Sequence, residues 1–273
     1  MAGDGAEGIY YHDGKGSYTN ANQEAGDNSY RYAGANPDNY VCFGTDAETC
    51  PNDNLYRIIG VFDNQVKLIK NTSIESNYWR GSTLNKINTW GSSKLNANVL
   101  NVTYYNALGS TWTSKIANHT WIVGGNTIAN MVYYPEGLPK KAYRNEIENP
   151  AESTTHSAKI GLMYVSDYYY GASPRYWTYP GYTTSSYPDA NGNYGSSYDY
   201  RAAINSNWMS EISEWTITRR SDTTDNAFYL SSPGFVYGLG VDHSLGIRPS
   251  FYLKSDVTLT GGTGTSADPY RIA

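Results

Sequence analysis

The chain has 273 residues, of which 39% are hydrophobic and only 16% are charged, and its formal net charge at pH 7 is −5. These values fit one large or two small domains with a buried core. They exclude sequence-independent binding of nucleic acid, which needs a basic face, because no cluster of Lys and Arg is larger than the pairs Lys140–Lys141 and Arg219–Arg220.

The apolar residues are unusual, since the chain contains 28 Tyr and 7 Trp but only 5 Phe and 4 Met. Tyr and Trp combine an apolar ring with a polar tip and suit surfaces that are both wet and adhesive. No apolar run approaches the roughly 18–20 residues that span a bilayer. This composition is typical of extracellular, β-rich binding proteins.

The first 54 residues are rich in Gly, Asn and Asp, and they predict short strands and turns around a cystine loop. The start, MAGDGAEG, is polar and is no signal peptide, so we expect that a preceding segment was removed. Cys42 and Cys50 flank seven residues that include the turn-forming Gly44. They could be two buried free thiols, but the spacing favours a disulfide and therefore an oxidising compartment.

Residues 55–273 are expected to form the main domain, on which residues 1–54 pack. The run at 55–70 predicts a β-hairpin with its turn at Asp63-Asn64. Residues 92–117 carry apolar side chains at spacings of three and four, which predicts helices, and Gly109 with Ser110 divides them into two.

Further strands are predicted along the rest of the chain, at 159–168, 214–220, 227–232, 235–240 and 246–254, and as a pair in the tail after 256. Residues 171–207 show no periodicity, and so long an irregular run is uncommon unless it is functional or disordered. Its many aromatic residues argue against disorder. Together these elements predict an α+β domain with short, mostly antiparallel strands, two helices and long irregular loops.

Signatures of catalysis are mostly absent from the sequence. The four histidines, His12, His119, His156 and His243, lie far apart and match no metal-binding motif. Asp242-His243-Ser244 contains the residue types of a triad, but consecutive residues cannot adopt its geometry. We expect no cofactor and no metal. The oxygens of Asp189, Asn191 and Asn193 alternate as in a calcium loop, but Tyr194 replaces the required Gly, which favours a turn.

Several stretches together, among them NSYRYAGANPDNYVCFGTDAETCPNDNLYRIIGVF, KIGLMYVSDY, EWTITRRSD, GIRPSFYLKSDV and GGTGTSADPYRI, carry a resemblance. The chain resembles, from about Asn28 on, a large family of uncharacterised surface proteins of Gram-positive gut bacteria, whose domains are similar to the C-type lectin fold. The resemblance implies a cell-surface or extracellular protein. It also implies contact with a membrane only through a missing N-terminal anchor.

Related lectin-fold proteins include binders diversified by retroelements, whose variable positions lie near the C-terminal strands and favour Tyr, Asn, Ser and Asp. Residues 219–245 are similar in composition. The chain departs from calcium-dependent lectins, because Asn36-Pro37-Asp38 comes too early and no Trp-Asn-Asp follows. It also departs from formylglycine-generating enzymes, because both cysteines lie in one early loop.

The hypothesis for the aromatic residues is a non-enzymatic binding face, in which Tyr provides contact area and Ser, Gly and Asn adapt around it. Its ligand-binding residues would be Tyr168, Tyr169, Tyr170, Tyr176, Trp177, Tyr179, Tyr182, Tyr187, Phe228, Tyr229, Phe235, Tyr237, Asp242 and His243. The partner would be a protein or a glycan.

Three alternatives stay open at this stage. The tyrosines could pack loops onto the sheet. The chain could be a pilin-like or phage-tail-like structural subunit. It could also be a glycan hydrolase, for which Asp167, Asp189, Asp199, Glu211 and Glu214 are available, although nothing in their spacing selects a catalytic pair.

Overall fold

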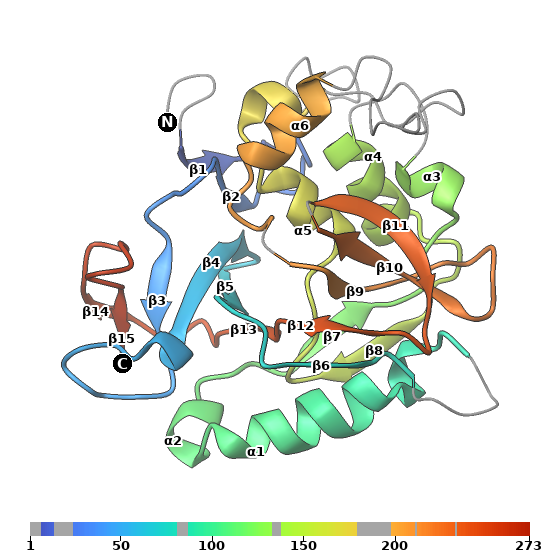
Figure 1. The fold of residues 1–273 in the computed structure, drawn as a ribbon. Coiled ribbons are helices and arrows are strands. Elements are labelled where there is room, and N and C mark those ends of the chain that lie inside the picture. The colour runs from blue at the N-terminus through green and yellow to red at the C-terminus, as the bar shows by residue number, and fades with distance from the viewer. Residues whose placement is uncertain are drawn as a thin grey trace.

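A computed structural model describes residues 7–13, 24–80, 87–132, 138–178, 198–210, 212–232 and 234–273. The fold is mixed α+β, as predicted, with mostly antiparallel strands in two larger sheets and two small ones (Figure 1). The strands are β1 Gly8–Tyr11, β2 Tyr30–Ala33, β3 Tyr40–Cys42, β4 Leu55–Phe62, β5 Gln65–Lys70, β6 Glu75–Tyr78, β7 His119–Ile122, β8 Thr155–Ala158, β9 Glu214–Arg219, β10 Asn226–Ser231, β11 Phe235–Gly240, β12 Ser244–Ile247, β13 Ser250–Tyr252, β14 Leu259–Gly261 and β15 Arg271–Ile272.

The first sheet has six strands in the order β1-β2-β4-β5-β13, and β3 also pairs with β4. Strands β1, β2 and β3 come from the first 54 residues, so this segment shares its sheet with the main domain. The predicted hairpin at 55–70 is confirmed as β4 and β5. Asp63 and Asn64 both have positive φ, of 48° and 61°, as a two-residue hairpin turn requires.

The second sheet has five strands in the order β11-β10-β9-β12-β6, and within it only the β9–β12 pair is parallel. The predicted strands at 214–220, 227–232 and 235–240 are confirmed as β9, β10 and β11. Two small sheets pair β7 with β8 and β14 with β15, so the predicted pair in the tail is confirmed too.

The single strand predicted for 246–254 is divided into β12 and β13, which belong to different sheets. The division falls at Arg248 and Pro249. Proline has no N–H to donate to a ladder, and the Arg248 guanidinium turns to bind the Glu214 carboxylate at 2.5 and 2.7 Å. The chain therefore crosses from the second sheet to the first at this point.

The helical elements are η1 Asn52–Asn54, η2 Trp90–Ser92, η3 Leu95–Tyr104, α1 Tyr105–Ala107, α2 Ser110–Thr113, α3 Ile128–Val132, α4 Leu138–Tyr143, η4 Arg144–Glu148, α5 Val165–Tyr170, η5 Pro174–Tyr176 and α6 Tyr198–Asn205. The predicted pair in 92–117 is confirmed. The continuous helix formed by η3 and α1 runs along one side of the molecule, and α3, α4 and α6 lie on the opposite side (Figure 1). Gly109, with φ of 77°, separates α1 from α2.

The strand predicted for 159–168 is wrong, because its first part makes only an isolated bridge between Gly161 and Ser250 and Val165–Tyr170 form α5. Two carboxylates satisfy the N–H groups that this helix start leaves without partners. Glu146 accepts from the backbone N–H of Ser166 at 2.6 Å and of Val165 at 3.3 Å. Asp167 accepts from that of Tyr164 at 2.8 Å.

Large aromatic side chains fill much of the core. Six tryptophans are buried, with exposed fractions of 7% or less: Trp79, Trp90, Trp112, Trp121, Trp208 and Trp215. Ring pairs such as Trp79–Trp90 and Phe43–Trp112 lie 5.0–5.4 Å apart. Such pairs stabilise a core by more than the burial of their apolar area alone. This additional stabilisation offsets the scarcity of Phe and Met.

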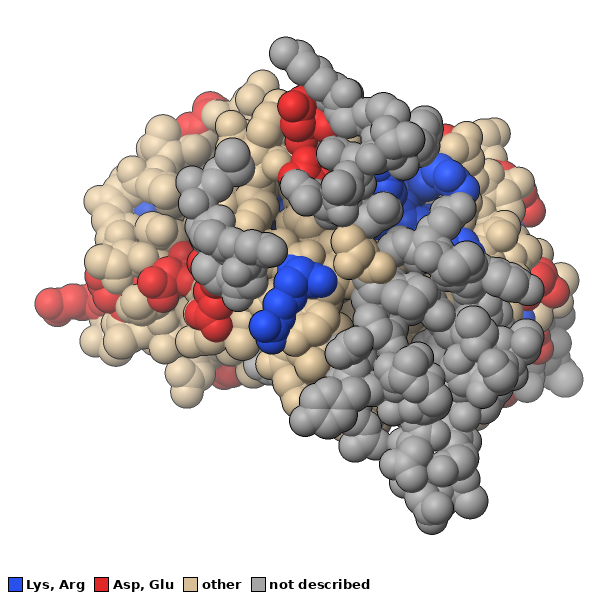
Figure 2. Space-filling view, turned by 90° about the horizontal axis from the view of Figure 1, so that it is seen from above, with Lys and Arg blue, Asp and Glu red and all other residues tan. Residues whose placement is uncertain are grey.

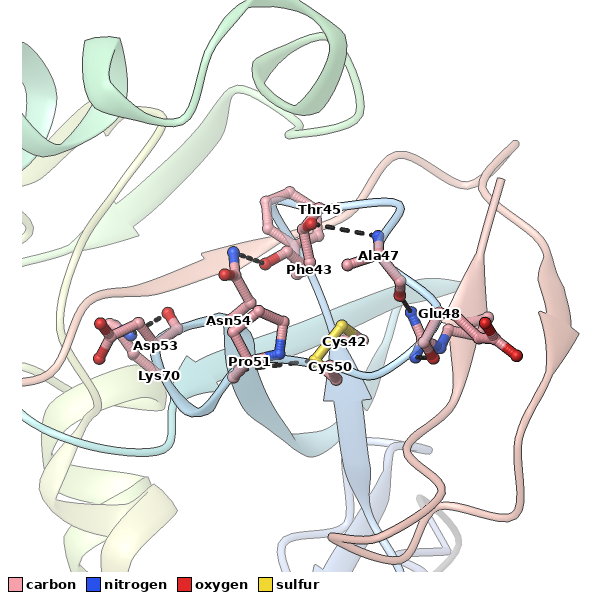
Figure 3. The surroundings of a disulfide bond; sticks show 11 residues. Cys42, Phe43, Thr45, Ala47, Glu48, Cys50, Pro51, Asp53, Asn54 and Lys70 are labelled. Atoms are coloured by element: carbon pink, nitrogen blue, oxygen red, sulfur yellow. Dashed lines mark hydrogen bonds between the residues drawn. A yellow bond between two sulfur atoms is a disulfide. The ribbon is translucent and has the colours of Figure 1, made fainter.

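The disulfide between Cys42 and Cys50 is confirmed, with the two Cα atoms 5.8 Å apart. It lies at the end of β3 (Figure 3), where Asn54 donates to the carbonyl of Phe43 at 2.9 Å and Lys70 donates to that of Asp53 at 2.6 Å. Arg271 of β15 donates to two carbonyls inside the loop. The cystine loop is thus attached to the C-terminal strands.

On the face in Figure 2, the described Lys and Arg side chains are interspersed with Asp and Glu among many neutral residues. Within the described ranges, no helix combines the length and apolar composition that crossing a bilayer would require.

Candidate functional site

Six of the aromatic residues predicted to form an outward face are buried: Tyr168, Tyr169, Tyr170, Trp177, Phe228 and Phe235. The expectation that they face solvent is wrong, and two of their polar tips have hydrogen-bond partners inside the protein. The Tyr168 hydroxyl donates to the carbonyl of Gly234 at 2.5 Å, and the Trp177 indole donates to that of Ala172 at 2.9 Å. Since Tyr168–Tyr170 lie on a helix, all three can be buried against different neighbours.

The other predicted ligand-binding residues are more accessible where the structure describes them. Tyr176 is half-buried in η5, and Tyr229 and Tyr237 are half-buried cross-strand neighbours on β10 and β11, with ring centroids 6.4 Å apart. Asp242 and His243 lie in the turn after β11, with side chains 24% and 58% exposed. Tyr179, Tyr182 and Tyr187 lie outside the described residues, as do Asp189, Asn191 and Asn193.

A groove of about 670 Å³ lies between α6 and the β3–β4 region, and we call it the α6 groove. This volume is within the range of about 300–1,000 Å³ found for ligand pockets. Its walls include Asn36, Tyr40, Arg57, Asn205, Trp208 and Ser232. Among the described residues, the groove therefore combines amides, hydroxyls and aromatic rings with the Arg57 cation.

The cation in the wall of the groove is held rigidly. Arg57 is only 3% exposed, and its guanidinium carbon lies 4.2 Å from the Tyr40 ring centroid and 4.6 Å from that of Trp208. Its Nε donates to Asn39 Oδ1 at 2.7 Å, and one Nη donates to a backbone carbonyl at 3.0 Å. Stacking and hydrogen bonding fix the guanidinium, so the rings beside it are preorganised.

The rim of the groove is polar and accessible, because Asn36, Asn205 and Ser232 are exposed. An amide offers two donors and an acceptor, so paired asparagines can bind neighbouring hydroxyl groups. Sequence reasoning missed this groove. In the sequence, Asn36-Pro37-Asp38 is recognisable only as a misplaced calcium motif. Helix α6 falls in the run 171–207, which shows no periodicity, so neither wall of the groove has a local signal.

A second hollow of about 260 Å³, which we call the Lys67 cleft, contains buried charges. Lys67 Nζ lies 2.5 Å from Asp167 Oδ2, and Arg31 contacts Asp167 at 3.6 Å and Asp27 at 2.6 Å. Both cations and Asp167 are at most 3% exposed. Two cations therefore face two carboxylates, and all but Asp27 are almost completely buried.

Burial perturbs the pKa values of this cluster. It lowers the pKa of Lys67, against the opposing effect of Asp167. Burial would raise the pKa of Asp27, but the charge of Arg31 and a hydrogen bond from Ser29 outweigh it and bring the pKa to about 2. Nearby, burial raises the pKa of Glu146 to about 7, although hydrogen bonds from Ser166 and Thr218 oppose it.

These carboxylates are poorly placed for glycoside hydrolysis, which needs one protonated acid and a second carboxylate across an open cleft. Asp27 and Asp167 are ion-paired, Glu146 is wholly buried, and Glu214 is bound by Arg248 with no exposed area. The described residues include no group of three His, Cys, Asp or Glu side chains that could hold a metal ion.

Comparison of the chain with family models, with curated proteins and with solved structures finds no match. The functional interpretation therefore depends on the geometry of the α6 groove and the Lys67 cleft.

Proposed function

We propose that the protein is a non-enzymatic binding module that holds a glycan in the α6 groove. It acts at the cell surface or in the extracellular space. The observation that carries the proposal is the groove itself, in which exposed amide and hydroxyl groups surround a fixed guanidinium stacked on two aromatic rings.

Carbohydrates present neighbouring hydroxyl groups and apolar ring faces. Asn36 and Asn205 at the rim match the hydroxyl groups, because each amide both donates and accepts. Tyr40, which is half-buried, offers a ring face on the wall. Tyr176 lines a smaller hollow that shares Ile204 and Asn207 with the groove, so one of the predicted ligand-binding tyrosines adjoins the site.

A glycan is a better partner here than a protein. Six of the aromatic anchors expected for a protein-binding face are buried, and protein interfaces depend on a few large, accessible anchors. A groove with a polar rim is suited instead to a narrow polar chain. The ion pairs of the buried Asp167 and Glu214 carboxylates support binding without catalysis.

The scaffold is proposed to be similar to the C-type lectin fold, in which a compact core of sheets and helices supports irregular ligand-binding loops. The described mixture of short antiparallel strands with a long helix is compatible with this proposal. The disulfide is consistent with a non-cytoplasmic location. Residues 219–245, which include the β10–β11 hairpin, stay the candidate for diversified positions.

The test is a printed glycan array probed with the purified chain, followed by calorimetry with the glycan that binds best. Asn36→Ala combined with Asn205→Ala removes two rim amides and is expected to weaken that binding about tenfold, since each hydrogen bond contributes about 0.5–1.5 kcal/mol. Both residues are exposed, so the fold should be retained.

Asn106→Ala is the matched control, because Asn106 is an exposed asparagine in α1, on the far side of the molecule from α6 (Figure 1). It should bind as the wild type does. Absence of binding to every glycan on the array would refute the proposal. Equal affinities of the double variant and the wild type would refute the assignment to this groove.

A further inference from the structure

The contact between Lys67 and Asp167 is unusual because an amine and a carboxyl group meet in the protein interior. Lys67 lies on β5 and Asp167 in the first turn of α5, and 100 positions separate them in the sequence. Lys67 Nζ is 2.5 Å from Asp167 Oδ2, and the two side chains are 0% and 2% exposed. Few lysines are buried so completely.

Aromatic rings enclose the amine. The centroids nearest to Lys67 Nζ are at distances of 4.5, 5.3, 5.4 and 5.8 Å, and they belong to Tyr164, Tyr252, Trp121 and Phe62. Such a shell excludes most water, and burial favours the uncharged form of an amine. The lowered pKa of Lys67 has this cause.

We propose that Lys67 and Asp167 condense to an amide, which joins β5 to α5 covalently. The reactive atoms are held together by the fold, and an intramolecular contact of this kind replaces a bimolecular encounter. The two reacting side chains are buried, and the Lys67 cleft that they line offers a path by which product water leaves.

The reaction balances without any co-reactant. A proton passes from the Lys67 ammonium to the Asp167 carboxylate, which gives a neutral amine and a neutral acid. The lone pair of Nζ attacks Cγ, and the negative charge develops on Oδ1, which faces Arg31 Nη1 at 3.6 Å. A positioned cation stabilises such an oxyanion. A second proton passes from Nζ to Oδ2, the Cγ–Oδ2 bond breaks, and one water molecule leaves.

Intact mass spectrometry of the reduced and denatured chain tests this proposal. The wild type is expected to weigh one water molecule less than its sequence. A proteolytic map should contain one branched peptide that joins the segments around Lys67 and Asp167. A wild-type chain at the full sequence mass would overturn the proposal, whatever the variants do.

Two lysine variants on β5 locate the bond. Lys67→Arg cannot condense and is expected at its full sequence mass. Lys70→Arg is the matched control, because Lys70 Nζ contacts a backbone carbonyl at 2.6 Å rather than a carboxyl group, so the loss of water should persist. A loss of water in the Lys67→Arg chain would place the dehydration elsewhere and would also overturn the proposal.

Discussion

Mild acid is expected to destabilise the fold through His12, which follows β1 directly. Its side chain has no exposed area, and its ring lies 4.8 Å from Tyr170 and 4.9 Å from Trp177, measured between centroids. The backbone N–H of Ala25 donates to Nδ1 at 3.0 Å, so the neutral ring carries its proton on Nε2. A second proton would have to displace this hydrogen bond.

The magnitude follows from the pKa of His12. Burial, followed by the nearby charge of Arg31, lowers this pKa to about 3, and Asp27 opposes the shift only in part. In the unfolded chain the pKa is about 6.5. Below that value the unfolded state binds more protons, so the free energy of unfolding falls as the pH falls. From the unfolded-state pKa of about 6.5 down to pH 5 is about 1.5 pH units, and each costs about 1.36 kcal/mol. The free energy of unfolding is therefore lower by about 2 kcal/mol at pH 5.

Denaturant unfolding of the wild type and of His12→Phe between pH 8 and pH 5 measures this loss. Phenylalanine keeps a ring among the aromatic neighbours but cannot take up a proton. The stability difference between the two proteins should therefore shift by about 2 kcal/mol in favour of the variant at pH 5. His243→Phe, at an exposed position, controls for the loss of a surface histidine. A difference between wild type and His12→Phe that stays constant with pH would refute the reasoning.

Three further variants and one control test the scaffold by denaturant unfolding. Replacing Cys42 and Cys50 by Ser should cost about 2–3 kcal/mol by the chain-entropy argument, and an unchanged midpoint would speak against it. Lys67→Met leaves a buried carboxylate without its amine and should cost at least about 3 kcal/mol; a loss below about 1 kcal/mol would contradict the buried contact. Gly124→Ala places a Cβ 1.6 Å from a backbone carbonyl oxygen and should cost about 1–3 kcal/mol. Gly261→Ala, which meets nothing within 4 Å, should cost much less, and equal losses would refute the argument.

Local signals in the sequence were sufficient for several elements. Asp63-Asn64 between two β-rich runs identifies the β4–β5 hairpin, because few residues adopt positive φ at both turn positions. Gly109 marks the end of the long helix for a similar reason. The spacing of Cys42 and Cys50 was sufficient to predict their disulfide.

Long-range contacts decide the features that the sequence did not reveal. Helix α5 begins where it does because Glu146, about twenty positions earlier, accepts from its first N–H groups. The burial of Tyr168 depends on the carbonyl of Gly234 in a distant turn. The α6 groove combines residues near Asn36, Arg57 and Asn205, which no single stretch of sequence brings together.

The cross-link proposed between Lys67 and Asp167 would also contribute to stability, because it closes a loop of 100 positions. The chain-entropy argument gives about 4.7 kcal/mol for a loop of that length. Wild type and Lys67→Arg should therefore differ strongly in unfolding by denaturant.

Glycan binding in the α6 groove is tested most directly by NMR titration of the isotope-labelled chain with the glycan selected on the array. The indole N–H of Trp208 and the side-chain amides of Asn36 and Asn205 should shift together and saturate with one affinity. Shifts confined to the β10–β11 hairpin, or no saturable shift at these three residues, would contradict the account.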